Sequence, residues 1–549
     1  MKANSLFSKQ LDNQYIHYTI LTAVCFFSFF IHNEIIPADL MESRNLATAQ
    51  EMVKYHNYLV PTLNGELRLE KPPLPTWIAA GIEHLFPDNL PVQRGVAGLS
   101  ASLMVLFLYL SVIRLTRNKS VGLISALVLA TCFNVILMGR TATWDIFCHS
   151  FMSGACYFLI IGLQKSGSSR KEFILAGIFA GLSFLSKGPV SFYALLLPFI
   201  LSYAFVFRPS LKEKKGSLIL MIGICLVVSF WWNLYILIFH SDAALSVAHK
   251  ESSSWFNHNV RPWYYYWQFP AEAGIWALFL VTSIVVYFTS RKKAFQKEYT
   301  FFLLWLAGSL LLLSLIPEKK TRYLLPISVP GAGLISLYLF RCIQGLTGAK
   351  DRIPFQINGG IIALILLFLP GVLYIIFQKE GTVSYPTLIG TGLLSWGLCL
   401  CLTRSLFGKK IRVGTGIAAI ILSMIMVTGL LPGAAAQLFL NDQRTGMRAL
   451  RYREKIKDLP FFHHNEDGLR METVYETNQI IRPLDPNNAA FVQDQAPFVF
   501  LSVRPIDSVF LNRSVQIEPL GIFDNNWRKP GHKRYNKNLV LEAAVIKTK

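Results

Sequence analysis

Charged residues are scarce in this chain of 549 residues, since Asp, Glu, Lys and Arg together make up only 15% of it. An ordinary soluble domain carries about a quarter of charged residues. Hydrophobic residues make up 53% of the chain, and they recur in runs close to the roughly 20 residues that a membrane-spanning helix needs. The shortage of charge therefore argues against a series of soluble domains and predicts a polytopic α-helical membrane protein.

Cysteine patterns that mark metal sites or disulfide frameworks are also absent from the sequence. All eight cysteines lie in or beside apolar runs, and none has Cys-x-x-Cys or Cys/His metal spacing. There is no internal repeat and no low-complexity segment. The first apolar run has no clear small-residue cleavage site, which indicates a retained helix and not a cleaved signal.

Thirteen apolar runs are predicted to span the membrane as helices, because backbone groups in lipid must pair within their own segment. With a cytoplasmic N-terminus, every loop on the cytoplasmic side is basic and short, as the positive-inside rule requires. This topology is the first explanation for the net charge of +21. The runs lie near residues 16–35, 95–113, 121–139, 146–163, 173–186, 189–207, 217–239, 268–289, 300–316, 323–341, 356–377, 385–403 and 413–435.

Two regions are too long to be simple connections, and both are predicted to lie outside the membrane on the outer side. One is the loop over residues 36–94, and the other is the tail over residues 441–549. The tail alternates polar stretches with strand-like runs such as Phe498–Val503, which is typical of a small mixed α/β domain. We therefore predict a transmembrane domain over residues 1–440 and a C-terminal α/β domain after it.

Acidic and basic residues stand where the first outer loop begins. Asp39 and Glu42 are three residues apart and share one face of a helix. They can form a capping box, or a carboxylate can orient or deprotonate an acceptor while Arg44 holds a phosphate bidentately. Both roles can hold at once. Further along the loop, Glu70 and Lys71 precede two prolines that stiffen the backbone, although an exposed loop with solvated charges is the alternative.

Short outer turns bring further charges close to the hydrocarbon, where they are costly unless they are paired or face a cavity. Lys187, Lys319, Lys320 and Arg322 also oppose the positive-inside rule. An anionic lipid phosphate would compensate for them, and the alternative is that the lysines reach out to the lipid headgroups. The three turns cover Arg140–Asp145, Ser186–Pro189 and Glu318–Tyr323.

The fourth outer loop combines His258 and Arg261 with the aromatic run Trp263–Trp267, which includes Tyr264. The aromatic residues are most simply an interfacial belt, and the alternative is that they stack on sugar rings. We predict that Glu70, His258, Arg261 and Tyr264 contact substrate. His258 and Glu70 can also bind a divalent metal ion, which is the one cofactor that the residues suggest.

Five segments, in order along the chain, resemble motifs of the aminoarabinose transferase family. These enzymes are relatives of the protein O-mannosyltransferases and have the C-type membrane glycosyltransferase fold. Met41–Asn45 resembles the family's Asp-Glu-x-Arg-Tyr, Glu70–Leu74 its Glu-Lys-Pro-Pro-Leu, Arg140–Asp145 its Arg-x-Ala-x-x-Asp, Ser186–Pro189 its Lys-Gly-Pro, and Arg322–Pro326 its Arg-Tyr-Leu-Leu-Pro. Two positions depart from the pattern: Met41 replaces the leading Asp, and Asn45 replaces the Tyr. Glu42 or Asp39 would then supply the carboxylate.

The resemblance implies an inner-membrane glycosyltransferase that moves a 4-amino-4-deoxy-L-arabinose-like sugar from undecaprenyl phosphate to lipid A or another envelope acceptor on the periplasmic face. It implies catalytic carboxylates among Glu42, Asp39 and Asp145. It also implies a set of residues that binds the donor phosphate, namely Arg44, Lys71, Lys187, Lys320, Arg322 and Tyr323.

Alternatives remain open at this point. The protein could be a polyprenyl-phosphate-dependent glycosyltransferase that acts on a protein or another glycan, or a transporter of lipid or sugar. Transporters place their charged sites near the bilayer midplane, whereas the charges here stand in outer loops and at helix ends, which favours chemistry at the membrane surface. No nucleic acid partner is expected.

Overall fold

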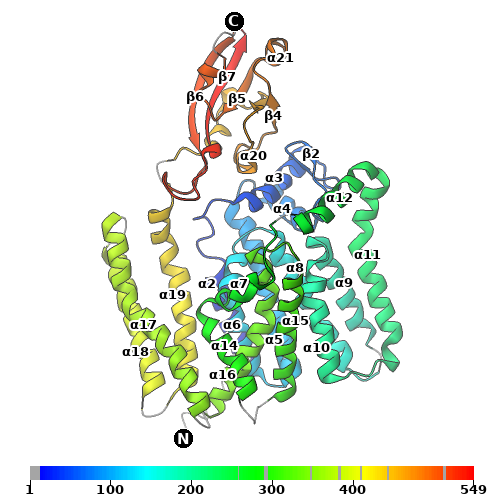
Figure 1. Ribbon diagram of the computed structural model, residues 1–549, viewed down its shortest axis with the longest axis vertical. Helices are drawn as coiled ribbons and strands as arrows, with labels where there is room; N and C mark the ends of the chain where they lie inside the picture. The colour runs from blue at the N-terminus through cyan, green and yellow to red at the C-terminus, as the bar shows by residue number, and fades with distance from the viewer. Residues whose placement is uncertain are drawn as a thin grey trace. The chain divides into compact units, whose positions relative to one another are not determined.

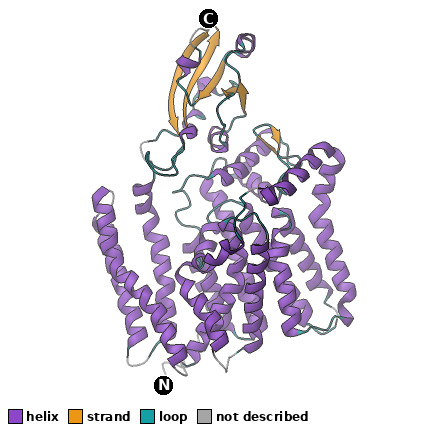
Figure 2. Cartoon of the chain, viewed as in Figure 1, coloured by secondary structure: helices purple, strands orange, loops and turns teal. Residues whose placement is uncertain are grey.

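The computed structural model describes residues 13–167, 169–257, 259–289, 295–345, 349–380, 385–408, 411–441, 444–510 and 515–548. The chain divides into two compact units. The first unit comprises residues Met1–Asn33, Glu70–Pro75 and Arg94–Pro432, and the second comprises Glu34–Leu69, Thr76–Gln93 and Gly433–Lys549. All strands of the described residues belong to the second unit, while the first is helical (Figures 1 and 2).

The first unit is a bundle of apolar helices joined by short turns. From α2 to α11, its elements are α2 (Gln14–Phe29), α5 (Leu90–Thr116), α6 (Lys119–Ala130), α7 (Phe133–Gly139), α8 (Trp144–Gln164), α9 (Arg170–Lys187), the π-helix η1 (Phe192–Leu196), α10 (Leu197–Phe207), η2 (Lys212–Lys214) and α11 (Lys215–Phe239). From α12 onward they are α12 (Ser241–Asn257), η3 (Trp263–Gln268), α13 (Phe269–Glu272), η4 (Gly274–Trp276), α14 (Ala277–Thr289), α15 (Gln296–Leu315), η5 (Thr321–Ile327), α16 (Ser328–Gln344), α17 (Ala349–Glu380), α18 (Tyr385–Phe407) and α19 (Val413–Phe439).

The thirteen predicted runs all fall on helices of this unit. In the described part of the chain, eight helices are long and apolar enough to cross a membrane, or up to ten if each of two bent pairs counts as one span. The other runs fall on α2, α9 and η1–α10, which are shorter or carry more charge. The chain is thus a multi-pass membrane protein, and the count of thirteen spans stays a prediction.

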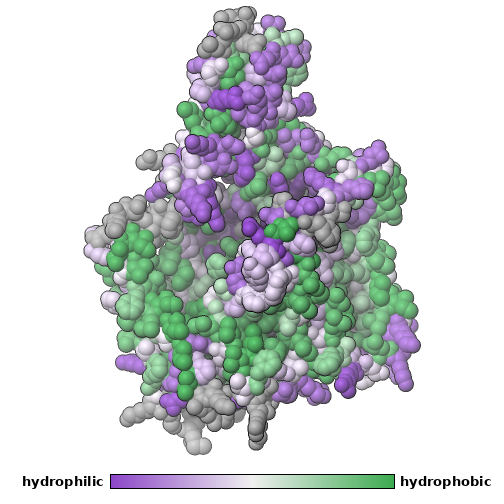
Figure 3. All heavy atoms as spheres, in the orientation of Figure 1, coloured by the Kyte–Doolittle hydropathy of each residue, from purple (hydrophilic) through white to green (hydrophobic). Residues whose placement is uncertain are grey.

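The outer helices of the bundle keep apolar side chains on their surface. On α11, Ile219 and Val227 are 71% and 70% exposed, and hydrophobic residues cover much of the visible face of the bundle (Figure 3). In contrast, the side chains of α16 are nearly all buried. A surface of this kind is stable in lipid, where exposed hydrophobic side chains carry no penalty.

Small residues set the close packing of α9 against α11. A Cβ atom added at Gly177 would lie 2.6 Å from the carbonyl oxygen of Met221, and one added at Gly181 would lie 2.5 Å from Cβ of Val228. The spacing Gly-x-x-x-Gly allows two backbones to approach in this way. It fixes the position of α9 and so of the lysine at its C-terminal end.

Two of the predicted runs are bent, and the breaks pack against each other. The angle between α6 and α7 is 65°, and the angle between Trp263–Glu272 and Gly274–Thr289 is 98°. Gly274 has a φ of +62° and approaches Phe133 so closely that a Cβ would lie 2.8 Å from the phenylalanine Cβ. The indole Nε1 of Trp276 donates to Thr131 Oγ1 over 2.8 Å. This hydrogen bond links the second break to the threonine hydroxyl at the break between α6 and α7.

The second unit combines the first long loop with the C-terminal tail. The loop forms α3 (Leu40–Tyr55), β1 (Thr62–Leu63), β2 (Glu66–Leu67) and α4 (Leu74–Leu85). The tail forms η6 (Met447–Leu450), η7 (Glu454–Ile456), β3 (Phe461–His464), α20 (Met471–Thr477), β4 (Ile481–Leu484), α21 (Ala489–Gln495), β5 (Phe498–Ser502), α22 (Ile506–Val509), β6 (Val515–Asp524), η8 (Lys537–Leu539) and β7 (Val540–Thr548).

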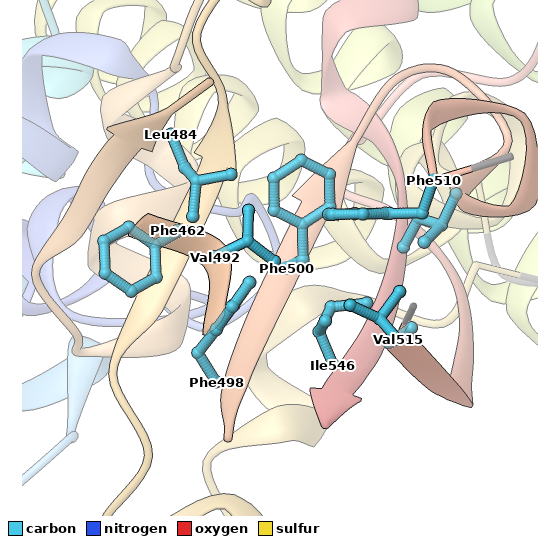
Figure 4. Close-up of a cluster of buried hydrophobic side chains, with 10 residues drawn as sticks. Phe462, Leu484, Val492, Phe498, Phe500, Phe510, Val515 and Ile546 are labelled. Carbon is cyan, nitrogen blue, oxygen red and sulfur yellow. The ribbon is translucent and has the colours of Figure 1, made fainter. Parts of the chain in front are cut away.

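The described part of the tail contains a mixed sheet with the strand order β4-β3-β5-β7-β6. β3 runs parallel to β4 and β5, with α20 and α21 as crossovers, and β7 runs antiparallel to β5 and β6. Every residue of β5 is buried, as expected for a central strand covered on both faces. Phe498 and Phe500 join Phe462 and Phe510 in the core (Figure 4). The predicted strand and mixed α/β character are confirmed.

Contacts between loop and tail explain why they form one unit. The side chain of Asn64 donates to the carbonyl of Ile481 over 2.8 Å and accepts from its N–H over 2.7 Å. Arg451 donates to Asp88 over 2.6 Å. Asn64 and Gly65 have φ values of +56° and +76°, and the turn that they form presents this asparagine to β4.

Candidate functional site

A buried ion pair lies between the start of α8 and the end of α9. Asp145 is in the first turn of α8, and Lys187 is the last residue of α9, so each charge complements the dipole of its own helix. The ammonium of Lys187 is ion-paired with Asp145 Oδ1, and the two side chains are 6% and 1% exposed. Such burial is tolerated only when both charges are paired. The structure therefore brings these two predicted residues together.

Cationic groups gather around the ring of Tyr323, at the start of η5. Lys187 Nζ lies 4.6 Å from the ring centroid, Lys320 Nζ lies 5.7 Å from it and the Arg322 guanidinium carbon lies 5.8 Å from it. An aromatic face attracts cations and separates like charges that would otherwise repel. Lys320 is also paired with Glu318. These four predicted residues share one region with Asp145.

The turn that carries Lys320 is fixed by η3 and by the segment before it. Tyr266 Oη accepts from the N–H of Lys320 over 3.1 Å and donates to its carbonyl over 3.2 Å. Val260 and Glu318 form a β-bridge, and the N–H of Arg261 donates to the carbonyl of Pro317 over 3.1 Å. The fourth outer loop thus holds the turn in place through the Tyr266 hydroxyl and through backbone hydrogen bonds.

Lys319, in the same turn, differs from Lys320 and Arg322 in its burial and in its hydrogen-bond partner. It is only 3% exposed, and its ammonium donates to the carbonyl of Ile316. Burial lowers the pKa of this lysine. The side chain holds the turn that ends α15, and it does not reach out toward the headgroups.

Hydroxyl groups connect the helices around Lys187. Ser183 donates to the carbonyl of Cys148 over 2.6 Å and shares a hydrogen bond of 2.7 Å with Ser191. Ser191 stands directly before η1, a π-helix that carries Tyr193. π-helical turns are rare and occur often at functional sites. The network joins α8, α9 and η1 where the lysine ends its helix.

Glu70 and Lys71 lie in a non-helical segment of bends before α4, in agreement with the two prolines that follow them. Glu70 is ion-paired with Lys250 over 3.4 Å, and these side chains are 30% and 72% exposed. A pair this exposed is weak, so the carboxylate of Glu70 is accessible. Lys71 is partly buried. Their contact with a substrate stays a prediction.

The remaining residues of the fourth outer loop lie at the surface. Arg261 is exposed, and Tyr264 is 54% exposed and forms an edge-on aromatic cluster with Trp263 and Trp267. His258 lies outside the described residues, so the predicted metal pairing with Glu70 is not tested. Among the described residues, no group of three or more His, Cys, Asp or Glu could hold a metal ion.

Residues of the first loop belong to the second unit. Asp39 caps α3, because its Oδ1 accepts from the N–H of Met41 over 2.9 Å and of Glu42 over 2.8 Å, and the capping interpretation is thereby confirmed. Glu42 is fully buried in the first turn of α3, while Arg44 is exposed. Asn45, at the position of the family's tyrosine, accepts from Thr76 over 2.7 Å. The catalytic roles of Asp39, Glu42 and Arg44 stay predictions.

Four residues of this region were not predicted from the sequence, namely Tyr266, Glu318, Tyr193 and His149. The Glu-Lys-Lys sequence before Thr321 is a visible signal for an ion pair within the turn. Tyr266 is hidden in an aromatic run that also fits a membrane interface. His149 stands four residues after Asp145, a spacing that places both on one helix face.

Comparisons with known proteins agree with the fold. Residues 70–232 match the family model described as dolichyl-phosphate-mannose-protein mannosyltransferase. The undecaprenyl phosphate-alpha-4-amino-4-deoxy-L-arabinose arabinosyl transferase of Yersinia enterocolitica is 23% identical over 59% of this chain and 60% of its own length. Transferase 1 of the same description from Pseudomonas fluorescens is 27% identical over 64% of this chain and 65% of its own length.

A solved structure extends the likeness to nearly the whole chain. The crystal structure of ArnT from Cupriavidus metallidurans bound to undecaprenyl phosphate has a TM-score of 0.68, with 13% identity, and 97% of each chain is covered. The fold is therefore the C-type fold of membrane glycosyltransferases. The chain is also similar in sequence to aminoarabinose transferases, the family that its five motifs resemble. The sequence alignments leave more than a third of each named relative unmatched.

Proposed function

We propose that this protein is a glycosyltransferase that moves 4-amino-4-deoxy-L-arabinose, or a closely similar sugar, from undecaprenyl phosphate to lipid A or another envelope acceptor. The names of its relatives support the donor and the sugar. The observation that carries the proposal is the gathering of Lys187, Lys320 and Arg322 around Tyr323, because a phosphate that leaves as an anion needs cations placed in advance.

In the proposed reaction, the bond between the anomeric carbon and the donor phosphate oxygen breaks, and undecaprenyl phosphate leaves with the electron pair. Lys187 and Arg322 stabilise the negative charge as it forms. Before the donor binds, Asp145 keeps Lys187 charged and oriented through their ion pair. An acceptor oxygen then completes the new glycosidic bond.

The acceptor determines the role of Glu42. If the acceptor is a phosphate of lipid A, it is already ionised, and no general base is required. Glu42 then holds the sugar amine or the positive charge that develops on the sugar ring. If the acceptor is a hydroxyl, Glu42 takes its proton. The same carboxylate fits both cases, so only the product identifies the acceptor.

Transfer by purified protein in liposomes tests the proposal. We expect Arg322→Ala and Lys71→Ala to reduce transfer from undecaprenyl-phosphate-linked aminoarabinose to lipid A by about 100-fold or more, as loss of a preorganised charge does. The matched control is Lys165→Ala, at the other end of the α8–α9 pair, where an exposed pair with Glu172 is broken. Full transfer by both site variants would overturn the proposal.

The orientation belongs to the same proposal. We place the N-terminus in the cytoplasm of a bacterial inner membrane, with thirteen spans, and residues 441–549 in the periplasm. Cysteine labelling with an impermeant maleimide in intact cells tests this, since the tail has no native cysteine. Ser508→Cys, an exposed position in the tail, should label from outside, while Lys212→Cys, in η2 directly before α11, should not. The reverse pattern would contradict the orientation.

A further inference from the structure

His149 is a fully buried histidine one helical turn after Asp145. Its residue exposure is 0%. Within the part of the chain that the structure describes, neither Nδ1 nor Nε2 has a hydrogen-bond partner. A buried polar group without a partner is costly, so a membrane helix is not expected to keep one for packing alone.

The geometry places this ring beside the ion pair. Residues four apart share a helix face with Cβ atoms roughly 5–6 Å apart, and helical side chains lean toward the N-terminus of their helix. We therefore expect the imidazole of His149 to lean toward Asp145. Asp145 and Lys187 both act electrostatically on this ring. Lys187 bonds Oδ1 of the aspartate, and Oδ2 is the oxygen to which an imidazole N–H can donate.

A conflict arises when a donor phosphate enters. Lys187 has one ammonium, which already serves Asp145 and the ring of Tyr323. If the ammonium turns toward a phosphate, the carboxylate of Asp145 loses its cation while it stays buried. An unpaired buried charge is strongly destabilising, so phosphate binding would be opposed unless another donor takes the place of the lysine.

We infer that His149 is that donor: its imidazole N–H bonds Asp145 Oδ2 and frees Lys187 for the phosphate of a polyprenyl phosphate. This inference rests on the proposed function, because it assumes that the site receives such a phosphate. His149 acts through Asp145 and Lys187, so it is a positioning residue and does not touch the substrate.

A double-mutant cycle on binding tests the exchange. The Kd of undecaprenyl phosphate is measured for the full-length protein in nanodiscs, with the wild type, His149→Phe, Asp145→Asn and the double variant. We expect His149→Phe to weaken binding by about tenfold, which is within the coupling range of residues in contact. In the Asp145→Asn background the same change should have no effect, because an amide is no longer a buried charge. Additive losses would overturn the inference.

Two further variants separate this role from packing. His149→Gln keeps an N–H donor, so it should bind undecaprenyl phosphate within about twofold of the wild type. His17→Phe removes another buried histidine, which is bonded to Tyr109 over 3.0 Å, and it should leave the Kd unchanged. If His149→Phe does not fold, His149→Leu carries the same expectation. Loss of binding in the Gln variant equal to that in the Phe or Leu variant would overturn the inference.

The choice of ligand separates this inference from the proposed function. Undecaprenol tests the need for a phosphate, and inorganic phosphate tests the need for the lipid. If wild-type protein binds undecaprenol as tightly as undecaprenyl phosphate, the proposed function fails, and the inference fails with it. If the wild type prefers undecaprenyl phosphate and His149→Phe keeps that preference in full, the partner exchange alone is refuted.

Discussion

Breaking the Asp145–Lys187 pair should destabilise the protein by an amount that depends on which charges remain. Lys187→Met removes the cation and leaves a carboxylate whose side chain is 1% exposed. Loss of one partner of a buried pair costs about 3–5 kcal/mol. The start of α8 offsets about 0.3–1 kcal/mol of this, and Arg322 also acts on the aspartate. We therefore expect a loss of about 3 kcal/mol.

Removing both charges should reverse most of this loss. In the double variant Asp145→Asn with Lys187→Met, no buried charge remains, and replacement of a whole buried pair by neutral groups is often neutral or stabilising. We expect its stability to lie within about 1 kcal/mol of the wild type. Transfer activity should stay lost, because the lysine is gone. Adding Asp145→Asn to Lys187→Met would thus restore the stability of the protein but not its transfer activity.

The assay is thermal unfolding in one detergent, followed by intrinsic fluorescence, with transfer measured on the same preparations. The control is Lys165→Met, which breaks a pair with 47% and 17% exposed side chains and should cost less than about 1 kcal/mol. The reasoning is refuted if the double variant melts as low as Lys187→Met, since the loss would then come from packing and not from charge.

Three further predictions follow from other parts of the molecule. Gly181→Leu should separate α9 from α11 and reduce both stability and transfer, because its Cβ would lie 2.5 Å from Val228; normal melting would contradict the packing account. Tyr266→Phe should leave the protein folded and raise KM about fivefold, since about 1 kcal/mol of hydrogen bonding to the Lys320 turn is lost; an unchanged KM would show that the turn is held by other contacts. Burial lowers the pKa of His463 from its usual 6.5, so the unfolded state binds more protons than the folded state. The free energy of unfolding should therefore fall as the pH drops below about 6.5. His463→Gln should flatten this pH dependence in melting curves.

The sequence predicted the positions of the helices because the length and hydrophobicity of each apolar run indicate a helix without reference to the rest of the chain. It did not predict the bends at Thr131 and Gly274, since these depend on one break packing against the other. The union of loop and tail was also not predicted. It rests on contacts such as that of Asn64 with Ile481, which are more than four hundred residues apart along the chain.

The candidate site was predictable in part for a similar reason. Asp145, Lys187 and Arg322 stood out because charges so close to hydrocarbon need partners, and the structure brings them together. Lys319 carried the same signal, yet its ammonium is bonded to a backbone carbonyl. The position of a charge near the hydrocarbon thus indicates that a lysine has a partner, but it does not identify that partner.

The central claim is that an envelope acceptor receives an aminoarabinose-like sugar from an undecaprenyl phosphate donor at this site. Mass spectrometry of lipid A and the other envelope glycans, from cells with and without the protein, tests it most directly. We expect one species, carrying an added amino-pentose, to disappear with the protein and to return with the wild type but not with Arg322→Ala. Identical spectra in all of these cells, under conditions in which the protein is made, would contradict the account.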